Sequence, residues 1–258
     1  MFSMPRDRVV LLTSDGESGR VAARYVATRF PALTVIVETP ESRSLLLRRR
    51  IKRLGLVHVG GQLAFMLFQR IQQRLTKSRI TEIIRKADLD ARWPEDRQII
   101  RMPSVNSLEC IDHLRRLQPG AILVMGTRII DAEVLRSVDA PFINYHAGVT
   151  PKYRGVHGGY WAKAQGDDDN FGVTIHLVDE GIDTGSVLYQ ARPATSAKDN
   201  YSSYPYLQLA AALPLLERSA REAIAGTLSP QRVDLPSRLW SHPTLWTYIQ
   251  TGLRRGVW

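Results

Sequence analysis

The chain has 258 residues, of which 44% are hydrophobic, and a formal net charge of +10. This length and composition are typical of one globular α/β domain with an elaboration, and no window approaches the roughly 18 apolar residues of a membrane span. A single cysteine, Cys110, excludes an internal disulfide and a cysteine-based zinc cluster. The N-terminal apolar run is too short for a signal peptide, so we expect a cytoplasmic protein. We also expect no metal site.

The first forty residues predict a βαβ unit. Val9–Leu12 are continuously apolar, as in a strand that is buried on both faces. Glycines interrupt this run over 13–20, and apolar residues then recur at helical spacing over 21–26. A second apolar run over 33–40 stops at Pro40. We therefore expect a parallel sheet with right-handed crossovers.

The next segment, about 43–95, is strongly basic. Between Ser42 and Thr81 it holds ten lysine and arginine residues and no aspartate or glutamate, a charge equal to the excess of the whole chain. We expect two helices here, broken near Gly60-Gly61. Three interpretations stay open: a solvated helical face, a surface for an anionic membrane, and a surface for nucleic acid. Apolar residues that would suit a membrane accompany the arginines: Leu45–Leu47, Leu63, Phe65, Met66 and Phe68.

The remainder of the chain predicts alternating strands and helices. The expected strands are a short one within 97–107, then 120–130, 141–148, and two arms around an acidic turn within 170–195. The expected helices cover 107–119, 131–138, a stretch from about Val156, and a long one near 203–226. A tail with three tryptophans follows over 239–258, and it could cover a dimer face or the rim of a site.

Two polar residues end the strand over 141–148. Asn144 and His146 stand two residues apart, so their side chains project to the same side of the strand, and Tyr145 projects to the other. At the carboxyl end of a strand in an open α/β sheet, that direction faces the ligand crevice. Taken alone, the pair is better explained by two hydrogen-bonded structural groups, because leaving either buried group unpaired costs roughly 1–3 kcal/mol.

A second polar cluster occupies the turn over 178–185. Asp179, Glu180 and Asp183 alternate there with Gly181 and Gly185. Alone, this pattern is typical of a solvated hairpin turn. The strand-borne pair followed along the chain by this acidic turn is a much more specific sign of function than either cluster alone.

Together the clusters resemble the formyltransferase family that uses 10-formyltetrahydrofolate. That family includes methionyl-tRNA formyltransferase, glycinamide ribonucleotide transformylase and the sugar N-formyltransferases, and this chain is closest in type to the last. The resemblance covers about 120–192 well and 5–40 loosely. It rests on Asn144, His146, Pro151, Tyr153-Arg154-Gly155, Gly172-Val173-Thr174-Ile175, Asp179, Gly181 and Asp183-Thr184-Gly185.

The resemblance implies an α/β fold with an open, mostly parallel twisted sheet, the Rossmann-like core of the family. The catalytic domain would span residues 1–195, with a basic helical insertion at about 41–95. Residues 196–258 would form a C-terminal helix and an aromatic tail packed on the core.

The family's catalytic trio carries over onto Asn144, His146 and Asp183. A substrate amine attacks the formyl carbon, and the Asn144 amide and His146 ring would donate hydrogen bonds to the formyl oxygen as charge develops on it. A preorganised donor of this kind is worth about 2.7–4 kcal/mol. Asp183 would hold the imidazole, favour its charged form and relay the proton of the amine through water.

The resemblance also implies N10-formyltetrahydrofolate as the formyl donor. Its candidate contacts are Met125, Thr127, Arg128, Ile129, Asp179, Gly181 and Ile182. Two departures from the family pattern concern the substrate: Ala147-Gly148 replace the usual Pro-Ser. In the loop that corresponds to the phosphate loop of the purine enzyme, this chain has Asp15 and Glu17.

The preferred acceptor is a nucleotide-linked 4-amino-4,6-dideoxy sugar, such as GDP-perosamine or a dTDP-linked sugar, for lipopolysaccharide O-antigen or another surface polysaccharide. The 73 residues after Gly185 are too few for the barrel of the tRNA enzyme, and the acidic loop disfavours the purine substrate. Aromatic residues could stack on a sugar or base. The substrate-side candidates are Tyr153, Arg154, His157, Tyr160 and Trp161.

Alternatives remain open. Methionyl-tRNA or glycinamide ribonucleotide could be the acceptor, or the chain could be a non-catalytic binding protein that recruits a partner through the basic segment. The intact trio argues against a binding protein, because such a protein has no need of all three residues. A homodimer and a peripheral membrane contact are also left open, and nucleic acid is the least favoured partner.

Overall fold

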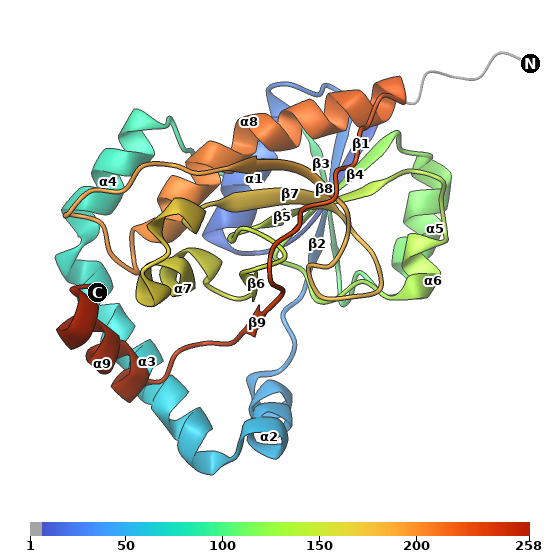
Figure 1. Cartoon of the computed structure of the whole chain (residues 1–258). Coiled ribbons are helices and arrows are strands. Elements are labelled where there is room, and N and C mark those ends of the chain that lie inside the picture. Colours follow the sequence, from blue (N-terminus) through green and yellow to red (C-terminus); the bar gives the residue numbers. More distant parts are fainter. Residues whose placement is uncertain (1–6) are drawn as a thin grey trace, which may run out of the picture.

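The computed structural model describes residues 7–258, apart from the side chain of Arg43. Seven strands form one open sheet in the order β3-β2-β1-β4-β5-β7-β8 (Figure 1), in which β1 to β5 run parallel and the last two strands pair antiparallel. This arrangement confirms the predicted α/β fold. The strands are β1 (Val9–Ser14), β2 (Leu33–Glu38), β3 (Gln98–Met102), β4 (Ala121–Met125), β5 (Phe142–His146), β7 (Val173–Leu177) and β8 (Val187–Ala191).

Helices connect the strands and cover the sheet. Two very short strands, β6 (Arg154–Gly155) and β9 (Leu239–Trp240), pair parallel to each other away from the main sheet. The helices are α1 (Glu17–Ala27), α2 (Arg43–Leu54), α3 (Leu56–Leu75), α4 (Lys77–Lys86), α5 (Leu108–Leu117), α6 (Ala132–Leu135), α7 (Gly158–Gln165), the 3₁₀ turn η1 (Asp168–Asn170), α8 (Tyr204–Ala225) and α9 (Leu245–Arg255). No helix within residues 7–258 is both long enough and apolar enough to span a bilayer.

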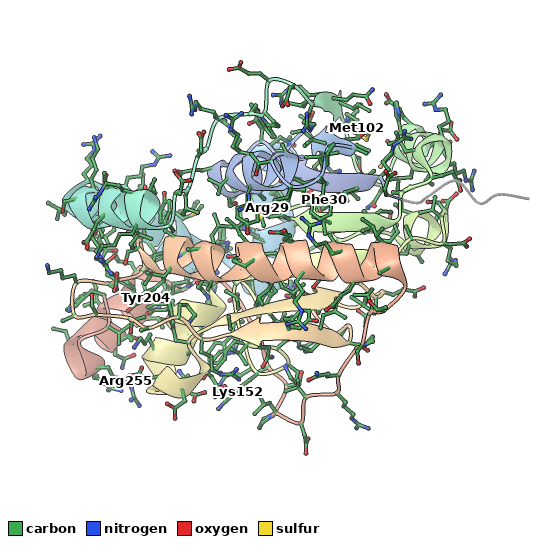
Figure 2. All side chains as sticks on the ribbon, turned by 90° about the horizontal axis from the view of Figure 1, so that it is seen from above. Arg29, Phe30, Met102, Lys152, Tyr204 and Arg255 are labelled. Carbon is green, nitrogen blue, oxygen red and sulfur yellow. The ribbon has the colours of Figure 1, made fainter. Side chains whose placement is uncertain are left out.

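The sheet is buried on both faces, which explains its continuous apolar runs. In β1, Val9 and Leu11 pack into the core under α1 and α8, whereas Val10 and Leu12 pack into the core under α5 and α6. The alternation follows from the two-residue period of a strand. Helix α8 lies across the first face (Figure 2), so the C-terminal part of the chain shares a hydrophobic core with the strands.

A third cluster of buried residues is almost entirely aromatic. It joins α3, α7 and α9 through side chains such as Phe65, Tyr160 and Tyr248. The Phe65 and Tyr248 rings lie 4.9 Å apart, and the Tyr160 and Tyr248 rings lie 5.8 Å apart. Such ring pairs stabilise by about 0.5–1.5 kcal/mol each beyond their buried area. The cluster therefore fixes the position of α3 and α9 relative to the sheet.

The basic segment differs from the prediction. It forms three helices instead of two, and the breaks fall at Gly55 and Thr76, whereas Gly60-Gly61 lie inside α3. Gly55 has a φ of 81°, a conformation that favours glycine. At Gly61 a Cβ atom would collide with the Trp246 ring of α9, so the absence of a side chain serves close helix packing there rather than helix termination.

Other predicted boundaries were too wide. The strand over 120–130 ends at Met125, because Gly126 turns the chain with a φ of 68°. The helix expected from about Val156 begins at Gly158, after His157 in a left-handed conformation. The predicted helix over 131–138 is only the short α6. The long helix near 203–226 is confirmed as α8.

Candidate functional site

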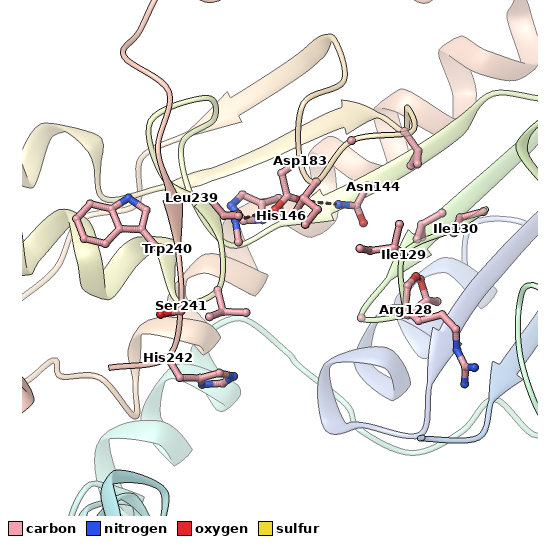
Figure 3. A pocket seen from close by; sticks show the side chains of 18 of the residues that line it. Arg128, Ile129, Ile130, Asn144, His146, Asp183, Leu239, Trp240, Ser241 and His242 are labelled. Carbon is pink, nitrogen blue, oxygen red and sulfur yellow. Dashed lines mark hydrogen bonds and ion pairs between the residues drawn. The ribbon is translucent and has the colours of Figure 1, made fainter. Parts of the chain in front are cut away.

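Asn144, His146 and Asp183 meet at the carboxyl end of β5. Asn144 and His146 project from β5, and Asp183 comes from the loop between β7 and β8 (Figure 3). Asp183 Oδ2 lies 3.3 Å from His146 Nδ1, and Asp183 Oδ1 lies 3.5 Å from Asn144 Nδ2. The strand period and the antiparallel hairpin thus bring the three residues singled out from the sequence to one point.

His146 is buried and has an oxygen atom beside each ring nitrogen. Its Nε2 donates a hydrogen bond of 2.6 Å to the carbonyl oxygen of Tyr153, while Nδ1 faces Asp183. Burial lowers the pKa of His146, and the charge of Asp183 and the Tyr153 carbonyl only partly oppose this effect. Asp183 thus favours the charged imidazole, as expected, but burial opposes it more strongly.

Asp183 remains ionised although it is largely buried. Burial alone would raise the pKa of this carboxyl, but the neighbouring rings of His176 and His146 lower it, as does the Gly155 N–H, which donates to Oδ2 at 2.8 Å. The net effect is a lowered pKa. Asp183 adopts a φ of 51°, which is unusual for a non-glycine residue, and this turn aims the carboxylate back at β5.

His176 on β7 is a fourth member of the site that the sequence interpretation missed. It stands opposite Asn144 in the β5–β7 register. Its Nδ1 donates to the Leu177 carbonyl at 2.7 Å, so its Nε2 can accept the hydrogen bond of 3.1 Å from Asn144 Nδ2. His176 Nε2 also lies 3.6 Å from Asp183 Oδ1. The hairpin predicted around the acidic turn pairs β7 with β8 and gave no signal for it, because His176 meets Asn144 through the pairing of β7 with β5.

These four side chains line one cavity of about 730 Å³. Its lining comes from five parts of the chain: the loop after β4, the ends of β5 and β7 with the acidic loop, helices α2 and α3, Gly155 and Val156 at β6, and the segment around β9. The lining residues include Gly126, Thr127, Arg128, Ile129, Asn144, His146, His176, Asp179, Gly181, Ile182, Asp183, Arg49, Arg50, Arg53, Gln62 and Leu239–His242. The volume lies within the range of known small-molecule sites.

Most of the folate candidates from the loop after β4 and from the acidic loop do line the cavity. Met125 does not: its side chain is buried in the core under α1 and α8. The Arg128 side chain turns away from the trio (Figure 3) and is held by Glu38, with its Nε 2.7 Å from Oε2. Arg128 therefore fixes the loop, and its guanidinium is already engaged.

The acidic loop is held by its own hydrogen bonds, and both this loop and the loop after β4 expose an isoleucine. Asp179 accepts hydrogen bonds from the Gly181 N–H at 3.1 Å and from the Thr184 hydroxyl at 2.7 Å, which stabilises the acidic turn. Ile129 and Ile182, one on each loop, line the cavity and remain exposed to solvent. The polar groups of the turn thus bond to one another, and the two loops leave the apolar surface of Ile129 and Ile182 open to a ligand.

The substrate-side candidates lie elsewhere, and none of the five is a lining residue among the described part of the chain. Tyr160 and Trp161, only 2% and 8% exposed, belong to the aromatic cluster because helix α7 turns them toward α3 and α9. Tyr153 is buried there too, and its hydroxyl donates to Asp167 at 2.7 Å. His157 donates to or accepts from His242 at 3.0 Å beneath the cavity wall.

Arg154 does not line the cavity but holds the acidic loop in place. Its guanidinium donates to the Ile182 carbonyl at 3.1 Å, which ties β6 to the acidic loop. The segment around β9 holds β6 in turn, since Arg154 N–H donates to the Arg238 carbonyl at 3.1 Å and Val156 N–H donates to the Trp240 carbonyl at 3.2 Å. Part of the tryptophan-containing tail thus forms the rim of the cavity.

Three arginines of α2, which we call the arginine wall, line the same cavity as the trio: Arg49, Arg50 and Arg53. The sequence interpretation did not include them in the site. The sequence showed a basic helix but gave no signal for where that helix folds. Within residues 7–258, no group of three or more histidine, cysteine, aspartate or glutamate residues could hold a metal ion.

Comparison with known proteins agrees with this site. A methionyl-tRNA formyltransferase from Acidobacterium capsulatum is 35% identical over 134 residues, which are 50% of this chain and 42% of that protein. The chain thus spans less than half the length of this curated relative. The model of the formyl transferase family matches residues 72–206, which include Asn144, His146, His176 and Asp183.

Solved structures share the fold at low sequence identity. A sugar N-formyltransferase from a Shewanella species has a TM-score of 0.56 and 17% identity, and the match covers 90% of this chain and 76% of that one. The N-formyltransferase of Helicobacter canadensis, in complex with folinic acid and dTDP-3-aminofucose, has a TM-score of 0.54 and 15% identity, with 90% and 70% covered. Because the family model matches more than half of its residues, this chain belongs to the formyl transferase family.

Proposed function

We propose that this chain transfers the formyl group of N10-formyltetrahydrofolate to the amine of a nucleotide-linked amino sugar. The observation that carries the proposal is the convergence of Asn144, His146 and Asp183 on one cavity. The family membership and the sugar N-formyltransferases among the structural neighbours support it.

The cavity suits the formyl donor. Folinic acid, a formylated tetrahydrofolate, is bound by the Helicobacter neighbour. Here Ile129 and Ile182 offer apolar surface on two loops, and a flat ring between them would cover both. The backbone of Thr127, Arg128 and Gly181 beside them carries the polar groups that a pterin needs, whereas Met125 is too deeply buried to take part.

The residues of the trio then have distinct roles. The donor, when bound, would supply the formyl carbon: the acceptor amine bonds to it, the bond between that carbon and N10 breaks, and tetrahydrofolate leaves with the proton that the amine gives up. Asn144 offers the N–H that points at Asp183, because that contact of 3.5 Å is too long to be strong and is readily redirected to the formyl oxygen. Such a donor contributes about 2.7–4 kcal/mol as charge collects on that oxygen.

Proton transfer falls to Asp183 and His146. Asp183 is ionised and faces the cavity, so it can take the proton of the attacking amine, directly or through water. His146 favours its neutral form, and its Nδ1 toward Asp183 can receive that proton in turn. The imidazolium formed would then sit between the carboxylate and the Tyr153 carbonyl, both of which stabilise the positive charge.

The arginine wall supports an acceptor that carries phosphates. Arg50 and Arg53 lie across the same cavity from the acidic loop, so an acceptor could place its amine at the trio and its diphosphate at α2. We propose a 4-amino-4,6-dideoxyhexose linked to GDP or dTDP, made in the cytoplasm for lipopolysaccharide O-antigen or another surface polysaccharide. Leu239–His242 replace the buried Tyr160 and Trp161 as candidate sugar contacts.

A turnover assay with a panel of amines tests this proposal. The chain is incubated with N10-formyltetrahydrofolate and GDP- or dTDP-linked amino sugars, methionyl-tRNA or glycinamide ribonucleotide, and the loss of the formyl donor is followed. We expect loss only with a nucleotide sugar. Turnover with methionyl-tRNA would instead assign the acceptor class of the curated relatives, and turnover with none of the amines would favour a binding protein.

A further inference from the structure

Helix α3 exposes a row of apolar residues although it buries two glutamines, which is unusual for a surface helix. Leu63, Leu67, Ile71 and Leu75 recur at intervals of four residues, so they form one ridge along the helix. All four are exposed, Leu67 by 61% and Leu75 by 80%. Nothing in the described chain covers this ridge, and a row of exposed leucines of this length usually marks an interaction surface.

Hydrogen bonds hold α3 in this orientation. On its inner side, buried Gln62 donates to the His242 carbonyl at 2.8 Å, and buried Gln69 accepts from the Ser202 hydroxyl at 3.0 Å. Phe65 is buried beside them, against Tyr248. Turning the leucines inward would break these contacts, so their exposure is built into the fold.

Helix α9 extends the apolar surface. It lies beside α3 (Figure 1), with the Trp246 ring against Gly61, and its own exposed residues recur at helical spacing. We call the exposed apolar residues of the two helices the ridge face: Leu56, Val57, Leu63, Met66, Leu67, Ile71 and Leu75 on α3, with Trp246, Ile249 and Leu253 on α9.

Basic residues flank the ridge face, and α3 itself contains no acidic residue. Arg70, Arg74 and Lys77 are exposed along the same part of the chain, and Arg254 and Arg255 end α9. No aspartate or glutamate occurs between Ser42 and Thr81. Apolar side chains beside cationic ones match the two layers of a lipid surface, acyl chains beneath anionic headgroups.

We propose that the ridge face docks on the surface of an anionic lipid bilayer. A second copy of the chain fits less well, because α2 and α3 of that copy contain no aspartate or glutamate that could pair with the flanking arginines. Nucleic acid fits less well too, because phosphates pair with arginines but leave a row of leucines exposed to water. Docking does not depend on formyl transfer and can be tested without it.

Docking would also bring the cavity close to the membrane. Helix α2, whose Arg50 and Arg53 line the cavity, leads directly into α3 at Gly55. The exposed Leu56 and Val57 begin α3 immediately after that turn, and Val57 is 79% exposed. A membrane-bound chain would thus hold its arginine wall beside the headgroups.

Co-sedimentation with vesicles tests the proposal in matched pairs of variants. We expect the wild-type chain to bind mixed phosphatidylcholine–phosphatidylglycerol vesicles at least about tenfold more tightly than phosphatidylcholine alone at low salt. Leu67→Ser should weaken binding severalfold, whereas Leu108→Ser, an equally exposed leucine on α5, should not. Arg70→Gln with Arg74→Gln should weaken it more than Arg115→Gln with Arg116→Gln on α5.

Three results would overturn the proposal. One is absence of wild-type binding to either kind of vesicle. Another is an equal effect of Leu67→Ser and Leu108→Ser. The third is a dimer in analytical ultracentrifugation that Leu67→Ser dissociates, since that would make the ridge face a self-association surface. All four variants change exposed residues, and circular dichroism verifies that each is folded.

Discussion

Asp183 is the residue on which the geometry of the site depends. It contacts both histidines and the Asn144 amide, and it accepts the Gly155 N–H, so one carboxylate orients three polar side chains. The left-handed turn that aims it comes from the short acidic loop between β7 and β8. Its roles in catalysis and in positioning can be separated because asparagine has the same shape without the charge.

Asp183→Asn should lower kcat by about 10²–10⁴, because the variant can no longer take the proton of the amine. The asparagine oxygen can still accept the Gly155 N–H, so the loop should keep its shape. Titration calorimetry should then show folinic acid binding within about threefold of wild type, a margin below 1 kcal/mol. Equal losses of binding and turnover would make Asp183 a ligand of the donor instead.

At this scale the alternation of a strand placed Asn144 and His146 on one side of it, and the resemblance to the formyltransferase family added Asp183 as their partner. The sequence interpretation failed for Tyr160 and Trp161, which were expected at the substrate. Their rings turn into the aromatic cluster, and which face of α7 becomes buried depends on α3 and α9, distant in sequence. His176 was missed because its importance lies in its register with Asn144.

The element that most distinguishes the site is helix α2. The sequence predicted a basic helical segment but could not predict that α2 folds over the carboxyl ends of the strands, since no local pattern encodes that contact. Arg50 and Arg53 line the cavity, whereas Arg48 and Lys52 on the same helix do not. The helix thus carries two pairs of cationic residues of equal charge, of which only Arg50 and Arg53 line the cavity.

Arg50→Gln with Arg53→Gln should raise KM for the nucleotide sugar by about tenfold or more and leave kcat nearly unchanged. Each charge-assisted hydrogen bond to a phosphate contributes roughly 1.5–3 kcal/mol. Steady-state kinetics without vesicles measures this effect. Arg48→Gln with Lys52→Gln removes the same charge from the helix and should change KM less than about twofold; an equal rise would mean that only the overall charge matters.

For the whole molecule, the half-buried pair of His157 and His242 at the cavity wall links stability to pH. Burial lowers the pKa of His157 to about 3, and burial with the nearby charge of Arg50 lowers that of His242 to about 4. In the unfolded chain both would take up protons near pH 6.5. Their contribution to stability is therefore fully present above that pH and is lost as the pH falls toward 4 for His242 and toward 3 for His157.

Urea denaturation should show this loss. The free energy of unfolding should fall by up to about 1.4 kcal/mol per pH unit for each histidine below pH 6.5, because only the unfolded state binds the protons. His157→Gln with His242→Gln should flatten the slope. An unchanged slope in that variant would show that other groups cause the acid sensitivity.

The fold as a whole was the most predictable level. The βαβ opening and the doubly buried strands follow from apolar runs, and the open sheet confirms them. The C-terminal tail was the least predictable part: β9 joins β6 beside the site, although β9 is only two residues long. A strand so short has no detectable pattern and forms only because both partners are already in place.

The most direct measurement follows the formyl group itself. With N10-formyltetrahydrofolate isotopically labelled in its formyl carbon, mass spectrometry should find the label on the amine of one nucleotide sugar. His146→Ala, with an unfolding midpoint close to wild type, should transfer it about 10²–10⁴ times more slowly. Label that stays on the folate with every amine, or an unchanged rate in His146→Ala, would contradict formyl transfer at this site.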